Sequence, residues 1–255
     1  MYIEKQEFIR PEIKTTPFCP GCGHRILMNL ILKAIEESQI NMDQMLFVSG
    51  IGCAAWIPSP HFNADTLHTL HGRAIAFATG AKLLNPELRT VVISGDGDLT
   101  SIGGNHLIHA ARRNIDLTVI CANNMIYGMT GGQAASTSPL GTVTATTMEG
   151  NVERPFDLCK LVLGAGAEYA ARYSITQKSG LINSIKNALS IPGFTFIEAL
   201  SPCPTHFGRR NRYDSPADMM KMLKKSCISK DDVKHLREEE LKNKIMTGEF
   251  TYGTY

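Results

Sequence analysis

The sequence predicts an α/β fold, with a parallel sheet flanked by helices. Short apolar runs of β-like composition alternate with longer amphipathic runs along the chain. Two of the short runs, TVVISG (90–95) and DLTVICAN (116–123), are rich in β-branched residues, which is typical of strands buried on both faces. Because strand and helix patterns repeat in turn, we expect βαβ units and hence a parallel sheet.

The expected elements follow one another in a regular order. Pro86 ends the second helix, and Leu107, Ile108 and Ala111 give the third an apolar side that would face the sheet. The predicted strands are residues 45–50, 90–95, 116–123, 167–173 and 194–200. The predicted helices are residues 24–37, 74–85, 103–114, 155–164 and 178–190.

Two segments fall outside this alternation. Residues 125–154 are rich in Gly, Thr, Ser and Ala and have little periodicity, which predicts a long loop of the kind that is usually functional. The charged tail, which contains DDVKHLREEELKNK, predicts a helical arm. We therefore expect one domain over residues 1–213 and a C-terminal helical extension over 214–255, packing on the domain or on a partner subunit.

Composition excludes several functional classes. With 43% apolar and 20% charged residues, the 255-residue chain has the composition of a globular protein. A net charge of +2 and only 7% aromatic residues argue against nucleic-acid binding. No apolar run reaches the roughly 18 residues of a membrane span. The first residues lack the apolar region of a signal peptide, so we expect a cytoplasmic protein.

Polar residues follow two neighbouring strands of the predicted sheet. Gly95-Asp96-Gly97-Asp98 ends one strand, and its glycines allow the backbone to approach a ligand closely. The next strand ends in Asn123-Asn124. A carboxylate and an amide oxygen at adjacent strand ends suit a hard cation such as Mg²⁺, which in turn binds phosphate oxygens. Taken singly, each pair could equally serve a plain turn.

The cysteines divide into two groups. An odd total of seven, without an export signal, argues against disulfides and for thiols that act as ligands or pack in the core. Cys19-Pro-Gly-Cys22 forms a tight turn, and Cys53 and Cys203 each follow a predicted strand end. These four could converge on zinc, an iron–sulfur cluster or a redox pair. The other three lie in apolar or helical runs and are expected to pack as small hydrophobes: Cys121, Cys159 and Cys227.

The spacing from GDG to NN resembles the thiamine diphosphate motif. Over nearly its full length the chain is similar to the β subunits of 2-oxoacid:ferredoxin oxidoreductases. The matching segments, in order, are CPGCGH (19–24), GIGC (50–53), HTLHGRA (68–74), GDGD (95–98), NN-x-x-YGMTGGQ (123–133) and PCPT (202–205). The segments WIPSPHF, HTLHGR and CPTHFGRRN look most like the 2-oxoglutarate synthase branch.

This resemblance implies a thiamine diphosphate-binding fold of the pyrophosphate type and a set of site residues. It implies a [4Fe-4S] cluster on Cys19, Cys22, Cys53 and Cys203, and Mg²⁺ on Asp96, Asn124 and the Ile126 carbonyl. The residues expected to line the cofactor are Ile51, Gly52, Cys53, Ala54, His68, His71, Gly95, Gly97, Asp98, Asn123, Gly128 and Met129. His24 is expected to open the first helix.

The resemblance also implies the reaction. It is the coenzyme A-dependent oxidative decarboxylation of a 2-oxo acid, foremost 2-oxoglutarate to succinyl-CoA, or the reverse. Electrons would pass from thiamine diphosphate through the cluster to ferredoxin. An α subunit would complete the site and supply a glutamate, and small γ and δ subunits are left open. Alternatives are pyruvate or branched-chain specificity, a cluster-free thiamine decarboxylase subunit, or a zinc-knuckle binding module.

Overall fold

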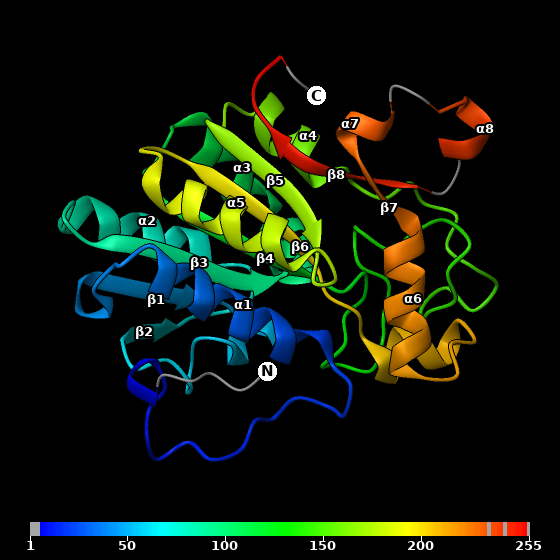
Figure 1. Ribbon diagram of the computed structural model, residues 1–255, viewed down its shortest axis with the longest axis horizontal. Helices are drawn as coiled ribbons and strands as arrows, with labels where there is room; N and C mark the ends of the chain where they lie inside the picture. Colours follow the sequence, from blue (N-terminus) through cyan, green and yellow to red (C-terminus); the bar gives the residue numbers. More distant parts are fainter. Residues whose placement is uncertain (1–5, 234–235, 242–243, 254–255) are drawn as a thin grey trace.

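The computed structural model describes residues 6–233, 236–241 and 244–253, and confirms the predicted α/β class (Figure 1). Its described strands form one eight-stranded sheet in the order β2-β1-β3-β4-β6-β5-β8-β7. Neighbouring strands run parallel except β5 and β8, which pair antiparallel. The strands are β1 (Met45–Ser49), β2 (Asp65–His68), β3 (Arg89–Gly95), β4 (Thr118–Asn123), β5 (Tyr169–Ser174), β6 (Thr195–Leu200), β7 (Cys227–Ser229) and β8 (Ile245–Phe250).

Helices cover both faces of the sheet. α1 and α5 pack on one face, and α2, α3 and α4 pack on the other. The helices are α1 (Gly23–Glu37), α2 (Ala74–Leu84), α3 (Gly104–Arg112), α4 (Leu158–Gly164), α5 (Lys178–Ser190), α6 (Pro216–Ser226), α7 (Lys230–Val233) and α8 (Glu238–Leu241). Shorter helical turns cover Gln6–Phe8, Met42–Gln44, Cys53–Trp56, Gly97–Ile102 and Pro204–Gly208. Among the described residues, no helix has both the length and the apolar character to cross a membrane.

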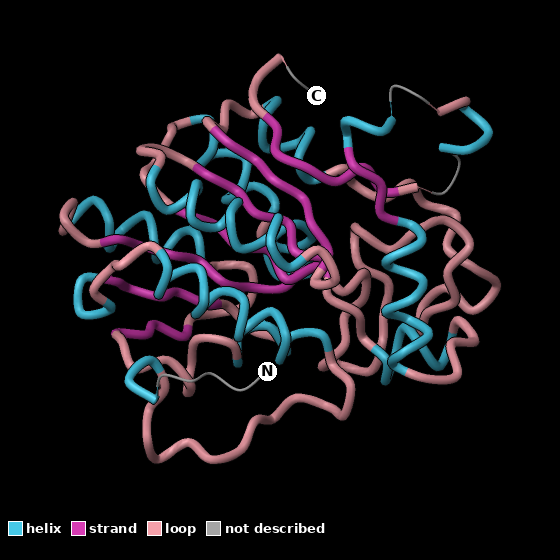
Figure 2. The backbone as a smooth tube through the Cα atoms, viewed as in Figure 1, coloured by secondary structure: helices cyan, strands magenta, loops and turns pink. Residues whose placement is uncertain are grey.

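The position of the central strands in the sheet explains why their sequences are mostly apolar. All residues of β4 and β6 are buried, because helices lie above and below them. Alternate side chains of β4 enter the two cores: Ile120 packs with α1 and α5, whereas Val119 packs with α2, α3 and α4. The predicted long loop, 125–154, contains no helix or strand, and it begins beside α6, where Met125 and Ile126 pack with Met219 and Leu223. Figure 2 shows the distribution of helices, strands and loops over the molecule.

The structure corrects the expectation for the C-terminal segment. The sequence predicts a helical extension over 214–255, whereas the described part also contains β7 and β8. Within the described residues of the charged stretch, the helical parts are the single turns α7 and α8. β8 pairs with β5, with Phe250 opposite Ala170, so the extension adds strands to the sheet of residues 1–213. The boundary at residue 213 stays a prediction.

Candidate functional site

Four neighbouring strands carry predicted site residues at their carboxyl ends. β1, β3, β4 and β6 lie side by side in the sheet. The segments that follow them contain, respectively, Cys53, Asp96, Asn124 and Cys203. Because the four strands are parallel, these segments meet at one edge of the sheet. The fold therefore brings the predicted metal-site residues of the strand ends together.

A pocket lies at this edge of the sheet. The three proposed magnesium ligands, Asp96, Asn124 and Ile126, form part of its wall. Most of the residues predicted to line the cofactor border it as well: Ile51, Gly52, Cys53, Ala54, His71, Gly95, Gly97, Asp98, Gly128 and Met129. The pocket thus joins the GDG segment, the NN segment and the loop after β1 into one site.

Asp96 supplies a buried carboxylate to this pocket. It is 1% exposed, and burial raises its pKa to about 6 against the lowering effect of its hydrogen bonds. Those bonds come from the Thr137 hydroxyl and, at 3.4 Å, from the Asn124 backbone N–H. Asn124 Oδ1 in turn accepts a hydrogen bond of 3.1 Å from the Ile126 N–H. A divalent cation would offset the cost of burying the Asp96 charge, and the donor set is all oxygen, so the residues fit Mg²⁺.

Asp98 has a different environment, although it also borders the pocket. Its Oδ1 accepts hydrogen bonds from His71 Nδ1 at 2.5 Å, the Gly72 N–H at 2.7 Å and the Ile51 N–H at 3.2 Å. Its Oδ2 accepts one of 2.6 Å from the Ser94 hydroxyl. Protein donors therefore surround this carboxylate. It fastens the loops after β1 and β2 to the GDG segment and so shapes the pocket.

Two of the predicted cofactor residues lie outside the pocket lining. His68 is exposed at the end of β2, where its ring meets the Trp56 ring edge-on with centroids 6.1 Å apart. Asn123 is 3% exposed and donates a hydrogen bond of 2.8 Å to Glu198 Oε1. Asn123 is the last residue of β4 and its amide bonds buried Glu198, whereas Asn124 follows the strand and borders the pocket. The pocket gives no support to a cofactor contact by His68 or Asn123.

Other residues border the pocket without having been predicted to. His24, expected only to open α1, lies in the wall together with Tyr127 and Thr130. Tyr127 donates a hydrogen bond of 2.9 Å to the Gly97 carbonyl, and its ring fills the space that a Cβ on Gly97 would need. The segment YGMTGGQ could have indicated Tyr127. Thr137, which bonds Asp96, lies in a loop whose composition singles out no residue.

The two N-terminal cysteines reach the same edge from outside the sheet. Cys22 is the N-cap of α1, and its N–H donates a hydrogen bond of 3.0 Å to the Cys19 carbonyl, which closes the turn. The Gly23 N–H then bonds the Pro202 carbonyl at 3.1 Å. This contact docks the turn on the loop that carries Cys203.

The four thiols influence one another electrostatically. Burial raises the pKa of Cys22 to about 12, the His24 N–H lowers it, and negative charge on Cys203, Cys53 and Cys19 raises it further. Burial, followed by charge on Cys203 and Cys19, raises the pKa of Cys53 to about 11. Positive iron atoms at this point would favour the thiolate forms, which fits a metal cluster.

The four cysteines are one possible ligand set for a metal. Within the described residues, no three Cys, His, Asp or Glu side chains gather closely enough to hold a single metal ion. Four cysteines can supply either a tetrahedral zinc ion or a [4Fe-4S] cluster, which takes one thiolate on each iron.

Two of the cysteines lie close to the pocket wall at Gly128. A Cβ built on Gly128 would lie 3.6 Å from Cys53 Sγ, 3.7 Å from Cys203 Sγ and 3.6 Å from Asn124 Nδ2. The pocket wall at Gly128 is therefore close to two of the four proposed cluster ligands and to one proposed magnesium ligand. The other cysteines lie elsewhere: Cys121 and Cys159 are buried in the core on the α2–α4 face, and Cys227 is half-buried.

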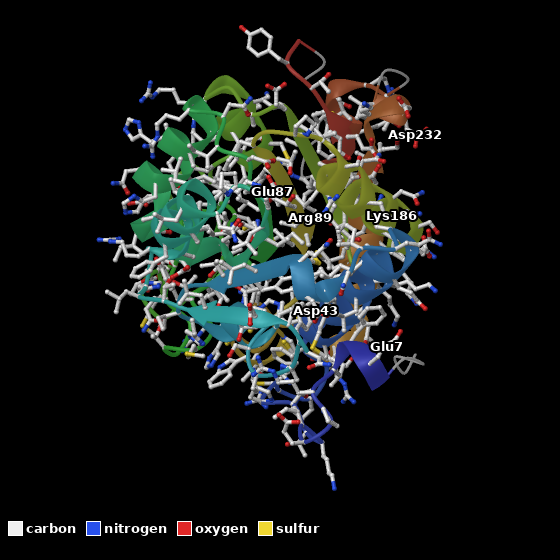
Figure 3. The ribbon with its side chains drawn as sticks, turned by 90° about the vertical axis from the view of Figure 1, so that its left-hand side faces the viewer. Glu7, Asp43, Glu87, Arg89, Lys186 and Asp232 are labelled. Atoms are coloured by element: carbon white, nitrogen blue, oxygen red, sulfur yellow. The ribbon has the colours of Figure 1, made fainter. Side chains whose placement is uncertain are left out.

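The opposite edge of the sheet, at the amino ends of the strands, has a different character. Figure 3 views this side and shows Glu87 and Arg89 on it. A groove here is lined by Lys82 and Asp116, which form an ion pair of 2.7 Å. Lys82 also donates to two backbone carbonyls, and Arg89 donates to a third. These charges bond the protein itself, so the carboxyl edge is the better candidate for a functional site.

Comparisons with known proteins agree with this geometry. Residues 50–199 match the family model described as thiamine pyrophosphate enzyme, C-terminal TPP binding domain. The 2-oxoglutarate synthase subunit KorB of Methanothermobacter marburgensis is 53% identical, over 91% of this chain and 81% of its own. The 2-oxoacid:ferredoxin oxidoreductase subunit beta of Saccharolobus solfataricus is 40% identical, over 76% of this chain and 64% of its own.

A solved structure is similar over almost the whole chain. It is the 2-oxoglutarate:ferredoxin oxidoreductase of Magnetococcus marinus, with 2-oxoglutarate, coenzyme A and succinyl-CoA bound. The match has a TM-score of 0.84 and 30% identity, and covers 98% of this chain and 85% of the other. These similarities confirm the thiamine diphosphate-binding fold. The chain belongs to the family of 2-oxoacid:ferredoxin oxidoreductase β subunits, in its 2-oxoglutarate synthase branch.

Proposed function

We propose that this chain is the cofactor-binding β subunit of an enzyme that converts 2-oxoglutarate and coenzyme A to succinyl-CoA and CO₂, or runs the reverse reaction, with ferredoxin as electron partner. The observation that carries the proposal is that Asn124, Cys53 and Cys203 all lie around the same point of the pocket wall, where a Cβ on Gly128 would meet them. This proximity supports a site for a metal-bound diphosphate directly beside a site for an electron carrier. The relatives named as 2-oxoglutarate synthase subunits support the choice of substrate.

In this proposal each group of residues has a defined task. Asp96, Asn124 and the Ile126 carbonyl hold Mg²⁺ and through it the diphosphate. When bound, thiamine diphosphate supplies the nucleophilic carbon and electron sink that decarboxylation of a 2-oxo acid needs. Asp98 keeps the surrounding loops in place through its hydrogen bonds. The four cysteines hold a [4Fe-4S] cluster, which can accept electrons singly, as zinc cannot.

The pocket supports a role for a partner subunit. Among the described residues that border it there is no glutamate, lysine or arginine. A carboxylate for the aminopyrimidine ring and a cation for the substrate carboxylates would therefore come from another chain. The segment after Cys53, Ala54-Ala55-Trp56, offers no basic side chain either. We propose an α subunit in this role, and a cytoplasmic location; γ and δ subunits stay open.

The test is to co-express the chain with its α partner and purify the complex without oxygen. Thiamine diphosphate, magnesium, iron and acid-labile sulfide are then quantified, and reduction of a viologen dye is assayed with coenzyme A and a panel of 2-oxo acids. We expect iron, sulfide and thiamine diphosphate together, the highest rate with 2-oxoglutarate, and no turnover by the β chain alone.

Other results would favour the alternatives. Zinc at one per chain without affinity for thiamine diphosphate would indicate a zinc-knuckle module. Bound thiamine diphosphate without iron would indicate a cluster-free decarboxylase subunit. A higher rate with pyruvate or a branched-chain 2-oxo acid would keep the chemistry and change the substrate.

A further inference from the structure

A buried carboxylate outside the pocket is bonded to the segment that carries the proposed magnesium ligands. Glu198 lies within β6 and is 4% exposed. Its Oε1 accepts a hydrogen bond of 2.8 Å from the Asn123 side-chain amide, and its Oε2 accepts one of 2.7 Å from Arg172 Nε. A buried ion pair is by itself a poor source of stability, so its use is better sought in what it positions.

Glu198 fixes which way the Asn123 amide faces. An ionised carboxylate can only accept hydrogen bonds, so the amide nitrogen of Asn123 must face Glu198. Its oxygen is then directed to the other side, where it accepts a bond of 2.9 Å from the Met125 N–H. Met125 has a positive φ of 64°, a conformation that a residue with a side chain adopts only when its surroundings hold it there.

The turn held in this way presents the proposed ligands. Asn124 and Ile126 flank Met125, and a hydrogen bond of 3.1 Å joins the Asn124 side chain to the Ile126 N–H. On the other side the Ser138 hydroxyl bonds the Met125 carbonyl at 2.7 Å. The direction of the Asn123 amide therefore affects where the Asn124 oxygen and the Ile126 carbonyl lie.

Glu198 is itself held from several elements. Arg172, on β5, also forms an ion pair of 2.5 Å with Asp157, which is the N-cap of α4. A third bond, of 3.3 Å, runs from Arg172 to the Met246 carbonyl on β8. The Cys159 thiol lies 3.8 Å from Glu198 Oε2. Since these partners lie on β5, α4 and β8, they leave Glu198 little freedom to move.

We propose that Glu198 is a positioning residue for the magnesium site. It does not border the pocket; it acts by orienting the Asn123 amide and thereby the turn that carries Asn124 and Ile126. This inference rests on the proposed function, because it assumes that Asp96 and Asn124 bind Mg²⁺. Changing residues that orient metal ligands commonly weakens metal affinity by about 10–100-fold, and that is the loss expected at Glu198.

The test compares three variants of the complex with its α partner. Glu198→Gln removes the obligatory acceptor. Glu168→Gln is the matched control, because exposed Glu168 accepts a hydrogen bond of the same 2.8 Å from the Asn114 amide, away from the pocket. The double variant Asn123→Asp/Glu198→Gln exchanges the two groups. The carboxylate at position 123 can then accept from both the new amide and the Met125 N–H.

Metal-free complex is titrated with Mg²⁺ by calorimetry at saturating thiamine diphosphate, and melting temperatures are recorded in parallel. We expect the affinity of Glu198→Gln to fall about tenfold or more, that of Glu168→Gln to stay within about twofold, and the double variant to return to within about threefold of wild type. Restoration by the exchange is a result that general destabilisation would not produce.

Unchanged affinity in Glu198→Gln would overturn the inference while leaving the proposed function intact. So would a double variant that binds Mg²⁺ no better than Glu198→Gln. If Glu198→Gln does not fold, the double variant decides alone: binding more than about tenfold weaker than wild type overturns the inference. A wild-type complex that does not bind Mg²⁺ would refute the proposed function and the inference with it.

Discussion

His24 Nδ1 lies 2.8 Å from the Ser201 hydroxyl oxygen, although 177 residues separate the two in the sequence. His24 is in the first turn of α1, directly after the turn that carries Cys19 and Cys22, and it borders the pocket. Ser201 follows β6 and precedes the loop of Cys203. The bond therefore joins the segment of Cys19 and Cys22 and the segment of Cys203 to the pocket wall.

Gly23→Ala should disturb this junction. A Cβ on Gly23 would lie 2.5 Å from Pro202 Cδ and 2.6 Å from Ser201 Oγ, so the two segments would have to separate. We expect the free energy of unfolding to fall by roughly 1–3 kcal/mol and the iron content of the complex to fall with it. Urea denaturation and iron analysis measure the two effects.

Gly104→Ala is the matched control for that prediction. Gly104 is the first residue of α3, as Gly23 is of α1, but a Cβ there would meet nothing within 4 Å. Alanine is the better helix former, so stability should stay the same or rise by up to about 1 kcal/mol. Equal effects of the two substitutions would refute the steric explanation.

Two buried groups should act on stability in opposite directions as the pH changes. Burial lowers the pKa of His24 to about 4 and raises that of Asp96 to about 6. Between about pH 4 and 6.5 the unfolded chain binds a proton at His24 that the folded chain does not, so the His24 term makes stability rise with pH. Between about pH 4 and 6 the folded chain binds a proton at Asp96 that the unfolded chain does not. The contribution of Asp96 therefore makes stability fall as the pH rises.

The corresponding variants should separate these terms. Without bound metal, Asp96→Asn should gain stability with rising pH relative to wild type, and His24→Gln should lose it, each by about 3 kcal/mol across the window. Urea unfolding of the metal-free chain at several pH values gives the differences, in which the other titrating groups cancel. Parallel pH profiles for all three proteins would contradict the assignment.

Whether a strand can be predicted from the sequence depends on how fully the fold buries it. β3, β4 and β6 could be predicted because burial on both faces requires apolar, β-branched residues. β2 could not, because it is a four-residue edge strand that is half-exposed, and β8 could not, because it is only partly buried and carries the mixed sequence IMTGEF. The tail was assigned from its charged helical stretch, whereas the strand that joins the sheet lies beyond it.

The site residues also divide into those that a local motif predicts and those whose partners lie far away in the sequence. Asp96 and Asn124 were located because each belongs to a local motif at a strand end, where parallel topology brings neighbours together. The direction of the Asn123 side chain depends on Glu198, 75 residues away, and the hydrogen bond to Asp96 comes from Thr137, 41 residues away. Such pairings are fixed by packing in three dimensions, and no spacing within one segment reports them.

Cys203→Ala tests the proposed division of the cysteines. Its sulfur lies beside Gly128 and interacts electrostatically with Cys22 and Cys53, so its loss should prevent stable cluster assembly. We expect most of the iron, the acid-labile sulfide and the broad visible absorbance to disappear from the anaerobically purified complex. Cys121→Ala is the control: it lies in the core of the α2–α4 face and should keep the iron at a cost of about 1 kcal/mol. Equal iron in both variants would exclude Cys203 as a ligand.

Phe250→Ala tests whether the C-terminal segment folds with the main sheet. Phe250 ends β8, is 1% exposed and packs in the core formed with α2, α3 and α4. Truncating a buried phenylalanine should lower the free energy of unfolding by about 3–5 kcal/mol, whereas Tyr252→Ala, at an 83% exposed position, should change it by less than about 0.5 kcal/mol. If β8 and the rest of the sheet form one cooperative unit, urea unfolding of Phe250→Ala followed by circular dichroism remains a single, shifted transition. A separate early transition, with the main one unmoved, would instead support an independent extension beginning near residue 214.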